Sequence, residues 1–236
     1  MLSWVNEKQD KDGLKLKKNR LLLFLGFLVL GLLAAAPALM GLAHFLAPLG
    51  AEKADAVVVE GGQIVQEGMM RAGVSLIREG RAKQIIIVLH RYSPRDQLFA
   101  IQDIYPNLIG KALEDLGLKN DQYQVLVAPI DRHPITLEEA CYVAPHLYHA
   151  GIRNAFLLCQ GFHTRRSLLA YQIQGDLLGI RFIPYPFFPY DDRDSWWKTT
   201  DALEDFGSQI IKLGYYLCKG YIPLTYLFRS SPVGSQ

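Results

Sequence analysis

A short stretch of the chain holds residue types that bind anions and move protons. Residues 156–169 read FLLCQGFHTRRSLL: an apolar run, a Gln-Gly break and then the start of a predicted helix. The basic side chains at this helix start are His163, Arg165 and Arg166. At the carboxyl end of a strand in an open α/β sheet, such side chains lie beside helix N-termini, which already attract anions. The stretch therefore predicts an anion site, with a solvated basic turn as the alternative.

Apolar runs alternate with helix-like segments through residues 54–220, the expected folded domain. The expected strands are 56–59, 84–89, 124–128, 154–159 and 181–185. The expected helices are 64–79, 98–116, 136–150, a segment after Thr164, and 195–219. Strands that are apolar along their whole length are covered on both faces, which is typical of parallel sheets. We therefore predict a Rossmann-like, doubly wound α/β domain with a mostly parallel five-stranded sheet. Pro184 places the fifth strand at an edge.

Two further loops at the ends of predicted strands are expected to complete the anion site. Gly61 and Gly62 follow the first strand, where glycines leave backbone amides free for a phosphate. Thr136 begins the helix after the third strand and can cap it. Together with Arg165 or Arg166, which would grip a phosphate, these residues are the predicted ligand-binding set.

Proton transfer in the same crevice would fall to three side chains. Glu60 directly follows the first expected strand, and Glu138 lies in the first turn of the helix that Thr136 begins. A carboxylate on each side of the imidazole of His163 suffices for general acid–base chemistry. We therefore predict His163, Glu138 and Glu60 as the catalytic candidates.

No metal centre or known cofactor motif is predicted. The sequence lacks GxGxxG, Walker A, nucleophile-elbow and HExxH patterns. Three histidines on loops of one predicted face, His90, His133 and His163, are a weak alternative as metal ligands because their spacing is generic. The three cysteines have no CxxC spacing, so we expect free, buried thiols. The cofactor is left unknown.

The N-terminal part of the chain predicts a membrane anchor. Residues 21–43 are uncharged and long enough to cross a bilayer as a helix, and basic residues come directly before them. The positive-inside rule then places the N-terminus in the cytoplasm and the domain on the periplasmic or extracellular side of the inner (plasma) membrane. We expect a basic cytoplasmic tail at residues 1–20 and a single-pass anchor at 21–46. A linker at 47–53 leads into the domain, and a flexible C-terminal tail follows it at 221–236. A signal peptide cleaved near residues 34–38 is the alternative, but the apolar run continues beyond them.

The net charge argues against a nucleic-acid partner. The 236 residues carry a formal net charge of +2, and half of them are hydrophobic. Residues 1–20 hold six basic and three acidic side chains, so the remaining residues carry a net −1. A domain this close to neutral is not expected to bind nucleic acid.

These motifs together resemble the YdcF-like family of envelope proteins that includes ElyC and SanA. The matching segments are ADAVVVEGG at the first strand, Thr136-Leu137-Glu138, the His163-x-x-Arg166 turn within GFHTRRS, and Trp196-Trp197-Lys198. The resemblance covers about residues 54–219. It implies a membrane-tethered Rossmann-like domain with a role in envelope biogenesis or barrier function, and no defined reaction.

The chain departs from the family pattern in three segments. Leu89-His90-Arg91 stands where the family usually has Ser-Gly-Gly, and Met69 stands where it often has Arg. Glu139 stands where it usually has Asn. With these departures the chain resembles a divergent branch of the family.

The leading hypothesis is an anchored envelope protein whose exported domain binds an anionic, phosphate-bearing, lipid-linked precursor. Acid–base chemistry on that precursor is left open. The alternative is a non-catalytic scaffold or regulator that binds a protein partner through the crevice or through the Trp196–Trp197 helix. A third hypothesis, S-adenosylmethionine binding, follows from relatives of the family, but an exported domain would rarely meet that cofactor.

Overall fold

The computed structural model describes residues 34–90, 101–130, 133–189 and 192–228, together with 20, 23–25, 27 and 31. The chain divides into two compact units, Met1–Leu42 and Ala43–Gln236. The described residues of the first unit are helical. Among the residues described, no helix is both long and apolar enough to traverse a membrane. Much of the predicted anchor, and residues 1–19 of the predicted basic tail, lie outside the described residues.

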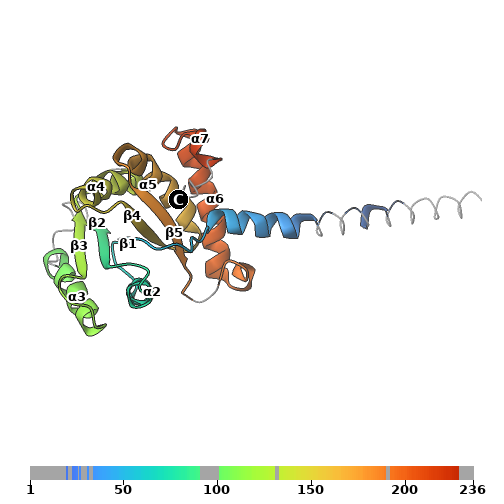
Figure 1. Cartoon of the computed structure of the whole chain (residues 1–236). Helices are drawn as coiled ribbons and strands as arrows, with labels where there is room; N and C mark the ends of the chain where they lie inside the picture. Colours follow the sequence, from blue (N-terminus) through green and yellow to red (C-terminus); the bar gives the residue numbers. More distant parts are fainter. Residues whose placement is uncertain are drawn as a thin grey trace, which may run out of the picture. The chain divides into compact units, whose positions relative to one another are not determined.

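Five parallel strands form one sheet in the second unit. They are β1 (Ala56–Gly62), β2 (Gln84–His90), β3 (Tyr123–Ala128), β4 (Asn154–Gln160) and β5 (Arg181–Phe187). Their order across the sheet is β3-β2-β1-β4-β5 (Figure 1). Strands β1, β2 and β4 each contain an unbroken run of buried side chains, mostly β-branched in β1 and β2, as a sheet covered on both faces requires. The predicted parallel five-stranded sheet is confirmed, with β5 at an edge.

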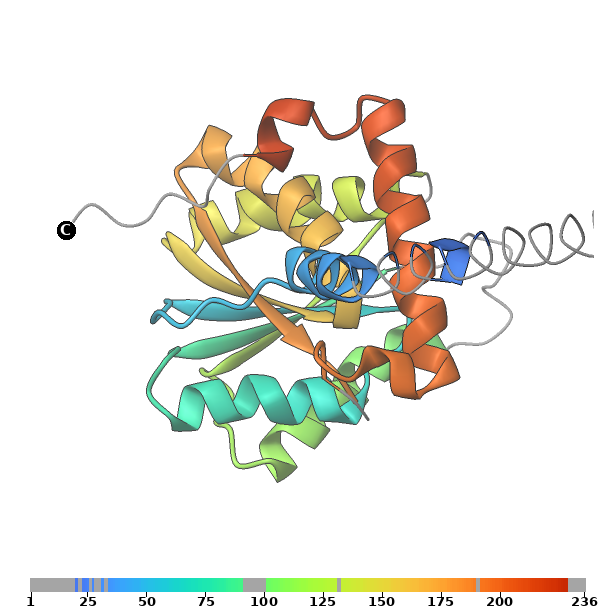
Figure 2. The ribbon, with the colours of Figure 1, turned by 90° about the vertical axis from the view of Figure 1, so that its right-hand side faces the viewer.

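Helices cover both faces of this sheet. The helices after the first strand are α2 (Glu67–Arg78), α3 (Ile101–Asp115), α4 (Ile135–His149), α5 (Thr164–Leu178), α6 (Thr200–Cys218) and α7 (Leu224–Leu227), and α2 to α5 are the ones that cover the sheet. One buried apolar cluster joins the sheet to α4 and α5, and the other joins it to α2 and α3. Figure 2 shows these two pairs of helices on opposite sides of the strands. The domain is therefore doubly wound, and a ligand crevice is expected where the strand order reverses, at the carboxyl ends of β1 and β4.

The end of β1 is shaped by two glycines. The register with β2 shifts between Glu60 and Gly62, which marks an irregularity at the mouth of the crevice. A Cβ atom on Gly61 would lie 2.9 Å from the carbonyl oxygen of Val88, so no larger residue fits without displacing backbone. Gly62 has a φ of +64°, which few other residues adopt.

The predicted last helix at 195–219 is wrong in one respect, because the structure has two elements there. A short 3₁₀ helix, η3 (Trp196–Lys198), comes before α6, and extended Thr199 separates them. Thr199 Oγ1 accepts a hydrogen bond from the backbone N–H of Ala202 and caps α6. Trp196 stacks on Phe206 at 3.9 Å between ring centroids and is buried, whereas Trp197 is exposed.

Two smaller expectations are met only in part. Residues 221–228 of the predicted tail are described: Ile222 is buried and α7 follows it, while residues 229–236 lie outside the described residues. All three cysteines are free, but only Cys159 is buried, since Cys141 and Cys218 are exposed.

Candidate functional site

A cavity of about 390 Å³ lies at the carboxyl ends of β1, β2 and β4. It is lined by Glu60, Gly61, Gly62, Gln63, Ile64, Gln66, Met69, His90, Thr136, Gln160 and His163. Of the predicted site residues, Glu60, Gly61, Gly62, Thr136 and His163 are thus brought together from three separate loops. The cavity lies at the reversal of strand order, where this fold places its ligands.

Glu60 is a buried residue in the lining of the cavity. Its side chain is 5 % exposed, and Ser167 Oγ donates a hydrogen bond to its Oε2 at 2.5 Å. Nε2 of His163 lies 3.2 Å from the same oxygen. Burial alone raises the pKa of Glu60, but the imidazole of His163 and the hydroxyl of Ser167 lower it to about 2. Glu60 is therefore an ionised carboxylate at neutral pH.

His163 is held through both of its ring nitrogens. A guanidinium nitrogen of Arg166 lies 2.6 Å from Nδ1 of His163. Because a guanidinium only donates, Nδ1 must accept, and the ring proton is on Nε2, 2.9 Å from Ser167 Oγ. Donors then run in one direction, from Arg166 through His163 and Ser167 to Glu60. The three residues of α5 and its N-cap can form this chain because positions 163, 166 and 167 share one helix face.

Arg166 supports the cavity from behind rather than lining it. It is 8 % exposed, and its Nη1 donates to Thr136 Oγ1 at 2.6 Å. Its Nε and Nη2 lie 3.4 Å from Oε1 of Gln209, and its guanidinium is 5.0 Å from the ring centroid of Tyr216. Arg166 therefore fixes Thr136 and His163, two residues that do line the cavity.

Arg165 and Glu138 are predicted site residues that lie outside the cavity lining. Arg165 donates to the carbonyl oxygen of Leu227 at 2.8 Å and stacks over Phe45 at 4.4 Å. Burial lowers the pKa of Arg165. Glu138 is half-buried on α4, and the neighbouring Glu139 takes the interior position instead.

Glu139 is a second buried carboxylate at the site, and it contacts His90. Its side chain is fully buried, and Tyr171 donates to its Oε1 at 2.8 Å. Its Oε2 lies 2.9 Å from His90 Nδ1, an ion-pair distance, although the angles do not make a hydrogen bond. Burial and the charge of Glu60 raise the pKa of Glu139, with His90 and Tyr171 opposing them. Burial lowers the pKa of His90, but Glu139 and Glu60 outweigh it and raise that pKa.

The pKa values of the two buried carboxylates are thus shifted in opposite directions. The pKa of Glu60 is lowered, while that of Glu139 is raised. Such a separation between neighbouring titratable groups is typical of sites that handle protons. The arrangement can hold an anion with imidazole, hydroxyl and amide donors, and it can exchange a proton at an imidazole.

Sequence reasoning missed Ser167 and Glu139 and named His90 only as a weak metal ligand. Ser167 carries a signal, since it lies one helical turn after His163. Glu139 lies on the buried face that begins at Thr136 and continues through Ala140. Helical phase therefore identifies both positions. The sequence signal for His90 is weaker, because it consists only of the position of this residue at the end of an apolar strand.

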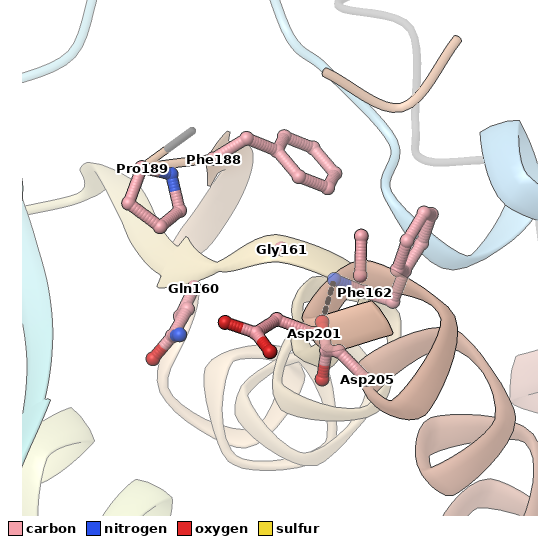
Figure 3. A pocket seen from close by; sticks show the side chains of 8 residues that line it. Gln160, Gly161, Phe162, Phe188, Pro189, Asp201 and Asp205 are labelled. Atoms are coloured by element: carbon pink, nitrogen blue, oxygen red, sulfur yellow. Dashed lines mark hydrogen bonds between the residues drawn. The ribbon is translucent and has the colours of Figure 1, made fainter. Parts of the chain in front are cut away.

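A second, smaller cavity of about 60 Å³ lies where β4 meets α6 (Figure 3). Oδ2 of Asp205 accepts a hydrogen bond from the backbone N–H of Phe162 at 3.1 Å. Gly161 has a φ of +46°, and a Cβ atom there would lie 2.6 Å from that same carboxylate oxygen. In Figure 3, Asp201 and Asp205 both extend from α6 toward the Gln160–Phe162 turn. Helix α6 thereby braces the turn that carries His163.

Neither a group of metal ligands nor a similar known protein gives further information about what this site does. In the described part of the chain, no three or more His, Cys, Asp or Glu side chains are grouped to hold a metal ion. No family model, no curated protein and no solved structure matches the chain. Function is therefore inferred from the cavity itself and from the resemblance noted in the sequence.

Proposed function

We propose that this protein is an envelope protein whose α/β domain binds an anionic, phosphate-bearing ligand, of the kind that a lipid-linked precursor presents. The cavity at the carboxyl ends of β1 and β4 carries this proposal. It presents the imidazole of His90, the hydroxyl of Thr136 and the glycine turn, with the ring of His163 also in its lining. Its two carboxylates are already engaged by protein donors, which reduces their repulsion of an anion.

Helix polarity adds to the attraction for an anion. Gln66 is the N-cap of α2, and Thr136 lies in the first turn of α4. In the part of the chain that the structure describes, the side chains of the N-cap residues Gln66 and Pro134 make no capping hydrogen bond. Gln66 and Thr136 both line the cavity, so the positive ends of two helix dipoles are directed at its contents.

The membrane part of the proposal rests on the sequence. The uncharged run at 21–43 and the basic residues before it support a single N-terminal span with the domain exported. The resemblance to the YdcF-like family supports the same arrangement. A tethered domain would meet a phosphate carried on a membrane lipid more often than a free domain would.

Calorimetry with a short polyprenyl phosphate tests the binding. The full chain in nanodiscs would be titrated with farnesyl phosphate, and with farnesol as the ligand that lacks the phosphate. We expect binding of the phosphate only, weakened about tenfold in Thr136→Val, which loses one hydroxyl donor, and retained in Thr136→Ser. His146→Asn is the control, because His146 contacts Gln124 and does not line the cavity. Equal affinity for farnesol, or no binding by the wild type, would overturn the proposal.

A further inference from the structure

The two imidazoles of the cavity are held by opposite partners. Nδ1 of His163 faces the guanidinium of Arg166 at 2.6 Å, whereas Nδ1 of His90 faces the carboxylate of Glu139 at 2.9 Å. A guanidinium can only donate, so Nδ1 of His163 is the acceptor in this contact. A carboxylate stabilises a proton on Nδ1 and therefore favours the imidazolium form of His90.

The second nitrogens of the two rings differ as well. Nε2 of His163 is directed at Ser167 and Glu60. Within the described residues, no hydrogen bond engages Nε2 of His90, and that side chain is 18 % exposed in the cavity lining. His90 is therefore the imidazole with a nitrogen left for a ligand.

We propose that His90 is the residue that exchanges a proton with the ligand in this cavity, and that Glu139 is its positioning residue. In one direction, the Nε2–H bond of the His90 imidazolium breaks and the lone pair of a ligand oxygen forms the new O–H bond. The imidazole is left neutral, with its remaining proton on Nδ1 against Glu139. The reverse transfer returns the proton to Nε2. The inference rests on the proposed function, because the ligand is the phosphate-bearing molecule.

The surrounding groups favour this role for His90. The titratable and charged groups around it in the described chain are Glu60 on β1, Glu139 on α4, Cys159 on β4, and His163, Arg166 and Tyr171 at α5. Both carboxylates raise the pKa of His90. Arg166 donates to Thr136 and His163. Burial raises the pKa values of Cys159 and Tyr171 well above their usual range, so both remain neutral.

His90 and Glu139 are also two of the three departures from the YdcF-like pattern. They lie on different elements, β2 and α4, yet their side chains meet. Two departures from the family pattern that are far apart in the sequence therefore supply two side chains that contact each other. The resemblance alone therefore does not supply this proton-exchange site.

Calorimetry in buffers of different ionisation enthalpy counts the protons taken up when farnesyl phosphate binds. At pH 8 the phosphate is a dianion, because its second pKa is about 6. When uptake is measured from pH 8 upward, we expect the full chain in nanodiscs to show a maximum at the pH where His90 is neutral in the free chain and gains a proton beside the bound dianion. His90→Gln, measured at saturating farnesyl phosphate, should show uptake close to zero at every pH. His146→Asn should match the wild type. Equal uptake by the wild type and His90→Gln would overturn the inference and leave the binding proposal standing.

Nitrogen NMR of the histidine side chains tests the pair without any ligand. We expect His90 to titrate at a higher pH in the wild type than in Glu139→Gln, with Glu139→Asp restoring part of the difference. Identical titration in the wild type and Glu139→Gln would overturn the positioning role. If the wild type fails to bind farnesyl phosphate, the proposed function fails, and this titration still decides the His90–Glu139 pairing.

Discussion

Oγ of Ser167 lies 2.5 Å from Oε2 of Glu60 and joins the start of α5 to the end of β1, 107 positions earlier in the chain. Nε2 of His163 approaches the same carboxylate oxygen to 3.2 Å. A buried carboxylate that accepts from a hydroxyl and lies beside an imidazole nitrogen is favoured as the anion. The end of β1 and the first turn of α5 are thus held together through one ionised side chain.

Glu60→Gln is expected to remove a pH dependence of stability at low pH. The pKa of Glu60 is lowered from 4.5 to about 2, so its contribution is complete above pH 4.5 and disappears as the pH falls toward 2. The wild type should lose roughly 3 kcal/mol relative to the variant over this interval. Urea unfolding at a series of pH values measures it, with exposed Glu67→Gln as a control that stays within about 0.5 kcal/mol of the wild type.

Glu139→Gln is expected to show the opposite trend. The pKa of Glu139 is raised in the folded state, so its ionisation destabilises the fold as the pH rises from 4.5 through the folded-state value. The variant lacks this cost, and its stability relative to the wild type should therefore increase with pH. Unfolding curves between pH 4 and 9 test this, with the exposed Glu204→Gln as the flat comparison. The prediction is contradicted if the stability of the variant relative to the wild type decreases as the pH rises.

Arg166→Gln is expected to destabilise the domain by about 2–4 kcal/mol. The change removes a buried charge and leaves the acceptors on Thr136, His163 and Gln209 without their donor. Arg71→Gln, at an exposed ion pair on α2, should cost no more than about 0.5 kcal/mol. Urea midpoints compare the two variants, and equal midpoints would show that Arg166 does not hold the site together.

Gly161→Ala is expected to cost about 2–3 kcal/mol, more than Gly80→Ala at about 1 kcal/mol. Both glycines have a positive φ, +46° and +66°, so both changes strain the backbone. Only at Gly161 would the new methyl group also displace the carboxylate of Asp205. Thermal or urea unfolding of the two variants separates strain from contact. The explanation fails if the two costs are equal.

Reporter fusions at the C-terminus test the proposed topology. We expect alkaline phosphatase to be active and green fluorescent protein to stay dark, because both behaviours follow from export of the domain. Replacing the basic residues at 15–20 by glutamine should weaken this orientation. A bright fluorescent fusion combined with an inactive phosphatase would place the domain in the cytoplasm and contradict the export proposal.

The sheet could be predicted because its strands are buried on both faces. Continuous apolar runs such as 85–89 reveal such strands directly, and the alternation with helices implies parallel pairing. The exact residues at which helices begin and end depend on local contacts instead. Thr199 separates η3 from α6 by adopting an extended backbone and capping α6, and the apolar pattern does not record that break.

The site was predictable as a meeting of loops but not as a set of contacts. Parallel strands bring their carboxyl ends together, so Glu60, Thr136 and His163 could be assigned to one cavity. The choice between Glu138 and Glu139 required the helical phase, because adjacent residues differ by about 100° around a helix. The contact between His90 and Glu139 depends on the packing of β2 against α4, which no local pattern encodes.

Helix α6 contributes three contacts to the site from the end of the domain. Gln209 and Tyr216 hold Arg166, and Asp205 holds the backbone of Phe162. During synthesis on the ribosome, all five strands emerge before α6 does. A nascent chain that ends after β5 therefore has its sheet residues but not the contacts that orient His163, so the arrangement of the site is complete only after α6 has been synthesised.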